Sequence, residues 1–394
     1  MAKVRLGDIA TVVTKGTTPT TMGFQFEDGG INFVKIESIS EDGTFLKEKF
    51  SHISDECNVQ MRRSQLQEND ILFSIAGAIG RSAIVTKEIL PANTNQALAI
   101  IRVSKGKIDY NYLLYALSSS AINQQATQHQ QGVAQLNISL KNVSDFLLPI
   151  YTEAMQKRIV HNLKKIDKLI SLRKQQLAKL DELVKARFVE MFGDFEVNPK
   201  EFPVYHLCEL CDVGSSKRIY QEEQSISGIP FLKVADLNEL IDTGKYSCST
   251  FIPLERYEQL LHKELTPTEN DILITSRGTL GKCYIVQSDD EFYFQDGMIS
   301  WLSNFSPKVS SIYISYLFAQ PYIQKQIESL QAGSTVAYLS IAMLKKMNVI
   351  LPPKKLQDDF ATFVEHVDQQ KQTVQQSLEK LELMKKALMQ EYFG

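Results

Sequence analysis

Apolar residues recur in alternating steps of about three and four over residues 159–191, which is the spacing of a long helix with one seam facing a partner. The seam residues are Ile159, Leu163, Ile166, Ile170, Leu177, Leu180 and Val184. The pattern returns 201 positions later, near the C-terminus. The second seam comprises Val364, Val367, Val374, Leu378, Leu381 and Leu388. The sequence therefore predicts two long helices, over residues 153–193 and 355–394, that pack along each other.

Charged residues interrupt both seams, at Arg173 and Arg187 in the first and at Lys371 and Lys385 in the second. The interruptions do not coincide under the repeat, so each helix can shelter the charges of the other. Residues 156–187 hold ten Lys or Arg and three Asp or Glu, whereas residues 357–388 hold four and six. This opposite charge balance favours pairing over two unrelated amphipathic surface helices, which is the alternative.

The same repeat runs through the rest of the chain. Residues 69–81 return as residues 270–282, and each copy has the pattern of an apolar strand, a turn with two glycines and a second strand. Short helical pieces are expected near residues 112–118 and 312–318. We therefore predict an α+β class with a pseudo-two-fold internal repeat: modules at 1–152 and 194–354, each followed by a long helix.

Composition limits the classes of function. The 394 residues carry a net charge of −3, so binding of DNA would need local basic patches or a partner. The N-terminus has no apolar signal segment, and no run of 18 apolar residues occurs. We expect a soluble, cytoplasmic protein with no membrane partner.

Known catalytic and metal-binding motifs do not match this sequence. Cys208 and Cys211 form the only C-x-x-C pair, without a second pair to complete a metal site. The segment 278–283 resembles a phosphate loop, but its first glycine and its final Ser or Thr are missing. We expect no catalytic residue, no metal and no cofactor on this chain.

Polar turns at equivalent places of the two modules are the remaining candidates for chemistry. Their Lys, Arg, Ser, Thr, Asn and Gln side chains are the types that contact phosphates and base edges. For any one of them, an ordinary polar turn is an equal alternative. The candidate DNA-binding residues are Lys15, Thr17, Thr18, Lys35, Arg81, Asn95, Gln96, Gln135, Asn137, Ser215, Ser216, Lys217, Arg218, Lys233, Ser276, Arg277, Lys282, Gln295 and Tyr338.

Taken together, these features resemble the specificity subunit of type I restriction-modification enzymes over essentially the whole chain. The resemblance rests on the paired Asn-Asp-Ile-Leu segments with their Gly-x-x-Gly turns at 69–80 and 270–281, and on Gly-Thr-Thr-Pro at 16–19. It also rests on the helix ends at 190–193 and 391–394. The second module departs from the first by having Lys217 at the place of Gly16.

The resemblance implies that the modules are target recognition domains, each reading one half of a bipartite, asymmetric sequence in double-stranded DNA. The two helices would form an antiparallel coiled coil between the domains. The partners would be modification subunits, two in number, and restriction subunits. S-adenosylmethionine would bind only to the modification subunit.

Two other functions use the same parts. An orphan sequence-specific DNA-binding regulator would lack a modification subunit. A coiled-coil scaffold without a DNA role would leave the duplicated polar turns unexplained.

Overall fold

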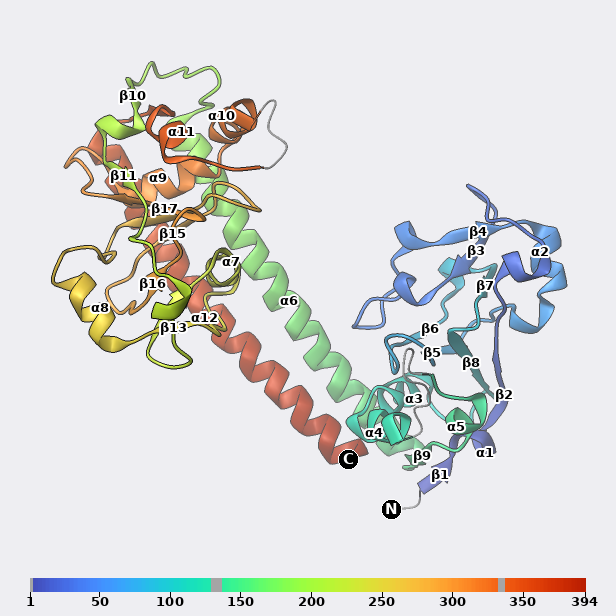
Figure 1. Cartoon of the computed structure of the whole chain (residues 1–394). Coiled ribbons are helices and arrows are strands. Elements are labelled where there is room, and N and C mark those ends of the chain that lie inside the picture. The colour runs from blue at the N-terminus through green and yellow to red at the C-terminus, as the bar shows by residue number, and fades with distance from the viewer. Residues whose placement is uncertain (1–2, 129–136, 332–336) are drawn as a thin grey trace. The chain divides into compact units, whose positions relative to one another are not determined.

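The computed structural model describes residues 3–128, 137–331 and 337–394 (Figure 1). The chain divides into two compact units, one formed by 1–175 with 375–394 and the other by 176–374. Each unit therefore contains one module and parts of both long helices. None of the helices in the described ranges is long and apolar enough to cross a membrane.

The two long helices are α6 (Glu153–Phe192) and α12 (Lys354–Phe393), each of 40 residues. Within the first unit Asp167 pairs with Lys385, and within the second Asp181 pairs with Lys371. Partner numbers fall on one helix as they rise on the other, so the predicted antiparallel coiled coil is confirmed. Buried seam residues are Ile159, Leu163, Ile166, Leu180, Val184, Val364, Val367, Val374 and Leu378. Half-buried seam residues are Ile170, Leu177, Leu381 and Leu388.

The charged seam positions have partners on the opposite helix. Lys385 Nζ lies 2.7 Å from Asp167 Oδ1, and Arg173 Nε donates to Ser377 Oγ at 3.2 Å. Lys371 Nζ lies 2.6 Å from Asp181 Oδ1. Burial alone lowers the pKa of Lys371, but the hydrogen bond to Asp181 and the nearby carboxylates outweigh it, and the pKa is raised.

Near the end of α6 the seam differs from the prediction. Phe188 is buried there, while the neighbouring Arg187 lies with its guanidinium 5.7 Å from the centre of the Phe363 ring. A helix has slightly more than 3.5 residues per turn, so the buried stripe has moved by one position at this end.

The first module contains two small sheets. The strands of the larger sheet, in order across it, are β2 (Ala10–Lys15), β8 (Leu98–Val103), β5 (Ile71–Ser74) and β6 (Ser82–Ile84), all antiparallel. The smaller sheet has β4 (Ser51–Ile53), β3 (Ile31–Val34) and β7 (Ala92–Thr94), with β3 and β7 parallel. A separate pair joins β1 (Lys3–Arg5) to β9 (Leu147–Pro149). The α-helices are α1 (Leu6–Ile9), α2 (Asp55–Gln60), α3 (Tyr110–Leu117), α4 (Ser120–Gln128) and α5 (Leu140–Ser144).

The second module has the same strand orders. Its larger sheet consists of β11 (Asp212–Gly214), β17 (Ile299–Ser303), β14 (Ile272–Thr275) and β15 (Cys283–Ile285). Its smaller sheet consists of β13 (Phe251–Ile252), β12 (Ile229–Leu232) and β16 (Tyr293–Phe294). Strand β10 (Val204–His206) pairs with β18 (Asn348–Ile350). The α-helices are α7 (Val234–Thr243), α8 (Leu254–Leu261), α9 (Ser311–Phe318), α10 (Pro321–Gln331) and α11 (Ile341–Lys345). The α+β class and the internal repeat are confirmed.

An irregularity in β2 corrects the alignment of the two modules. The register of β2 against β8 shifts between Ala10 and Val12, whereas β11 pairs regularly with β17. Val13 lies opposite Ile101 and Val213 lies opposite Leu302, so the repeat spacing falls from 201 to 200 after the irregularity. Gly16 therefore corresponds to Ser216 and not to Lys217.

A buried glutamine fixes the start of each long helix to its module. The Gln357 side chain is 0% exposed; its Oε1 accepts a hydrogen bond from Ser310 N at 2.9 Å. Its Nε2 donates to Pro352 O at 2.7 Å and to Lys308 O at 3.1 Å. At the equivalent place, Gln156 accepts from Asp109 N and donates to Tyr151 O. Both amides thus accept a hydrogen bond from the N-cap residue of a helix in their own module, α9 for Gln357 and α3 for Gln156.

Replacing Gln357 by Met should keep the side-chain volume but leave buried backbone groups of Ser310 and Pro352 unpaired. We expect the free energy of unfolding to fall by about 3 kcal/mol, because each unsatisfied buried group costs roughly 1–3 kcal/mol. Urea unfolding measures the loss. Gln372→Met, at an exposed position of the same helix, is the control and should change stability little. Equal stability of the two variants would contradict a structural role for the buried amide.

Candidate nucleic-acid interface

In the first module, the loop after β2 lies against the loop between β7 and β8. Gly16 N donates to Asn95 O at 3.1 Å, and Thr18 Oγ1 donates to Gln96 Oε1 at 2.6 Å. A Cβ atom on Gly16 would lie 1.7 Å from Thr94 O, so no other residue fits without displacing one loop. The two loops are held as one polar surface, with Gln96 exposed at its edge.

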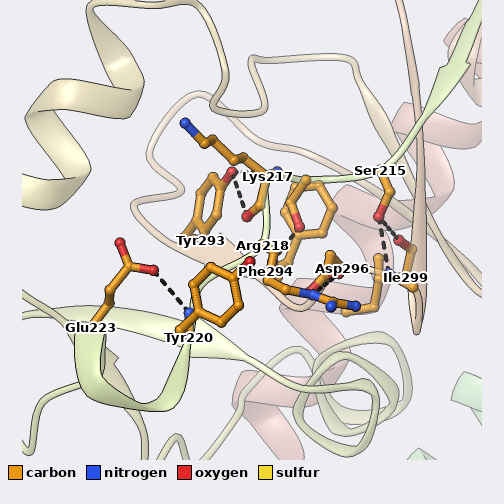
Figure 2. A network of polar contacts seen from close by, with 11 residues as sticks. Ser215, Lys217, Arg218, Tyr220, Glu223, Tyr293, Phe294, Asp296 and Ile299 are labelled. Atoms are coloured by element: carbon orange, nitrogen blue, oxygen red, sulfur yellow. Dashed lines mark hydrogen bonds and ion pairs between the residues drawn. The ribbon is translucent and has the colours of Figure 1, made fainter.

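The second module holds the equivalent loops together with side chains (Figure 2). Ser216 Oγ donates to Phe294 O at 2.7 Å, and Ser215 Oγ donates to Ile299 O at 2.9 Å. Phe294 O is the counterpart of Thr94 O, because Phe294 and Thr94 occupy the same place, the last residue of the parallel strand pair in the smaller sheet of each module. In the second module the Ser216 hydroxyl therefore bonds to the carbonyl equivalent to the one that Gly16 approaches in the first module.

Lys217 and Arg218 project from a backbone that has fixed partners. Lys217 N donates to the Tyr293 hydroxyl at 2.8 Å, and that hydroxyl lies 3.3 Å from Lys217 O, to which it can donate (Figure 2). Burial raises the pKa of Tyr293, so its hydroxyl keeps its proton near neutral pH. Arg218 Nε donates to Asp296 Oδ2 at 2.9 Å. Both cationic side chains are exposed.

Basic residues beside the glycine turns have partners within their own module. Arg81 donates through one terminal nitrogen to Ile39 O at 2.9 Å, which ties the turn to a neighbouring loop. In its counterpart Lys282, the Nζ atom lies 2.6 Å from Asp242 Oδ1, at the end of α7. These contacts give Arg81 and Lys282 a structural role, which is to hold the glycine turns against neighbouring parts of their modules.

Arg277 and Ser276, adjacent in the second glycine turn, have different environments. Arg277 is exposed, with its guanidinium 5.1 Å from the centre of the Tyr338 ring. Ser276 is 1% exposed and shares a 2.7 Å hydrogen bond with Ser300. The Ser276 hydroxyl is therefore bonded within the core of its module, like that of Ser216, and contact of either with DNA stays a prediction.

The other candidates lie around these loops. Lys15, Lys233 and Asn137 are exposed, whereas Thr17, Asn95, Gln295 and Tyr338 are half-buried. Lys35 is half-buried, with its amine 4.3 Å from the centre of the Phe26 ring. Gln135 lies outside the described residues.

The described ranges contain no group of three or more His, Cys, Asp or Glu residues placed to hold a metal ion. Of the C-x-x-C pair, Cys208 is exposed and Cys211 is buried, and burial raises the pKa of the Cys211 thiol to about 12. Cys211 therefore remains a thiol at neutral pH and packs in the core of its module.

The sequence matches the family described as type I restriction modification DNA specificity domain twice, over residues 1–182 and 199–383. The type I restriction enzyme MjaVIII specificity subunit of Methanocaldococcus jannaschii is 24% identical over 412 residues, covering 98% of this chain and 90% of the relative.

Two solved structures share the fold. The S subunit of a type I restriction-modification system from M. genitalium covers 100% of this chain and 96% of its own, with 15% identity and a TM-score of 0.56. A chain from a study of assembly and conformational transition of the type I R-M system covers 100% and 97%, with 16% identity and a TM-score of 0.62.

Replacing Gly16 by Ala should force apart the two loops of the first module, because the new methyl group would meet a backbone oxygen. We expect a loss of about 1–3 kcal/mol in the free energy of unfolding, as for other overpacked sites. Faster amide exchange of Gly16 should accompany the loss. Gly214→Ala is the control, since a Cβ there meets no atom within 4 Å and should leave stability unchanged.

Proposed function

Because the chain belongs to the family of type I restriction-modification DNA specificity proteins, we propose that it reads a bipartite, asymmetric DNA target without carrying out catalysis itself. One observation carries the proposal. The same pair of loops recurs in both modules, at equivalent places of the sheets, with different polar side chains. Two readers of one architecture but different chemistry suit two unlike half-sites.

The recognition domains are assigned to residues 1–152 and 194–354, and the segments 153–193 and 355–394 to the helical scaffold. The side chains best placed to meet DNA are the exposed ones on the paired loops and on the second glycine turn. They are Lys15, Gln96, Lys217, Arg218 and Arg277.

We assign the two catalytic activities, methylation and DNA cleavage, to partner subunits. Modification subunits that bind S-adenosylmethionine would carry out methylation, and restriction subunits would cleave. The internal repeat presents the same strand orders and the same kind of helix junction twice, which supports two modification subunits per chain. The net charge of −3 supports partners that provide much of the contact to phosphate.

Deleting the gene in its host should abolish methylation at one bipartite sequence and leave every other methylated motif intact. Sequencing that detects methylated bases across the genome measures this. Restoring the gene should restore that motif, and purification of the tagged chain should recover a methyltransferase. An unchanged set of methylated motifs, together with purification of the chain alone, would instead identify an orphan regulator.

The coiled coil can be tested separately from DNA contact. Leu378 is 6% exposed in the seam, so Leu378→Asp places an unpaired charge between the helices and should cost several kcal/mol, on the order of 3. We expect loss of co-purification with the modification subunit. Gln376→Asp, at an exposed position of the same helix, should assemble normally. Assembly of the Leu378 variant in full yield would show that the seam is not required.

A further inference from the structure

One side-chain contact joins the same two loops in both modules. In the first module it joins Thr18 to Gln96, and in the second it joins Arg218 to Asp296. The two members of each pair are separated by 78 positions. Each member in the second module lies 200 positions after its equivalent in the first. Counting along the smaller sheets gives the same correspondence, because Gln96 and Asp296 each lie two residues beyond the end of their strand, β7 or β16. The contact is therefore an equivalent position of the repeat.

The long side chain of the pair comes from opposite loops in the two modules. In the first module the long side chain, Gln96, follows β7, and the short one, Thr18, follows β2. In the second module the long side chain, Arg218, follows β11, and the short one, Asp296, follows β16. In both, the short partner holds the long side chain through one polar atom. The position is kept while the exposed functional group changes from an amide to a guanidinium.

The hydrogen bond in each pair leaves the groups free that recognise a base edge. Arg218 uses Nε for Asp296, and among the described residues its two terminal nitrogens have no hydrogen-bond partner. Its side chain is 65% exposed, while that of Asp296 is 21% exposed. Gln96 Oε1 accepts one bond from Thr18 and has a second lone pair, and its amide nitrogen can donate.

We propose that this contact is a specificity-determining position in each module, at which Arg218 reads guanine and Gln96 reads adenine. The two terminal nitrogens of an arginine match O6 and N7 of guanine, and an amide matches N6 and N7 of adenine. Asp296 and Thr18 are positioning residues that fix the near end of the reading side chain. This inference rests on the proposed function and adds the base type at one position of each half-site.

Arg218→Ala tests the assignment without endangering the fold, because the side chain is mostly exposed. The complex of this variant with its modification subunit would be measured for equilibrium binding at fixed salt. The duplexes would carry the target and each single base-pair substitution of it. At one G·C pair of one half-site, we expect the preference for guanine to fall by about tenfold or more, as for loss of one bidentate contact. Preferences in the other half-site should stay unchanged.

Three further variants sharpen the test. Arg218→Lys, which keeps the charge without the planar fork, should keep only part of the preference. Lys263→Ala removes an exposed cation elsewhere in the module and should leave every preference as it was. Transplanting the first-module pair, as Arg218→Thr with Asp296→Gln, should change the preferred pair at that position from G·C to A·T.

The outcomes separate the base assignment from the proposed function. A uniform loss of affinity for all duplexes in Arg218→Ala would mean a phosphate contact and would overturn the assignment. A change at a position that is not G·C, or in both half-sites, would overturn it too. Failure of the unaltered complex to prefer any sequence would instead reject the proposed function.

Discussion

An aromatic contact between a helix end and a module is the interaction on which the rest of the structure depends. In the first unit the ring of Phe393, at the end of α12, lies 5.3 Å from that of Tyr112 in α3. In the second unit the ring centre of Phe192, at the end of α6, lies 5.1 Å from that of Tyr313 in α9. All four side chains are buried. The Tyr112 hydroxyl donates to Pro149 O just before α6, so the end of one long helix and the start of the other meet at one residue.

Each hydrophobic core therefore belongs jointly to a module and to both helices. The first core contains Ile159 from α6 and Phe393 from α12, and the second contains Phe192 and Phe360. Burial of such side chains contributes about 1.5–3 kcal/mol each, so a module without its helix ends would lose a large part of its stability. The buried glutamines act at the same junctions, by pairing backbone groups that the packing removes from water.

The sequence was most informative where a pattern repeats over many residues. The seam of Ile159, Leu163 and their successors follows from spacing alone, because burial of one helix face imposes that spacing. The correspondence between the paired loops of the two modules could not be predicted, because the irregularity in β2 depends on its pairing with β8, a strand far along the chain. Ser276 and Arg81 have the residue types of DNA contacts, and only the fold shows that their polar groups bind Ser300 and Ile39. Gln156 and Gln357 are 201 positions apart, but nothing in the residue type of a glutamine indicates burial.

The paired loops and the helix junctions have few residues in common, and this has a consequence for how such a chain can diverge. Gly16 of the first module corresponds to Ser216 of the second, and the Thr18 contact corresponds to an ion pair, while a tyrosine receives the helix end in both. The contact residues that differ between the two modules lie in loops, whereas those that hold the helices lie in the cores. A duplicated ancestor could therefore acquire a second preference through a few surface substitutions, with no compensating change in its framework. In this chain the two modules differ in the loop contacts and agree in the helix junctions.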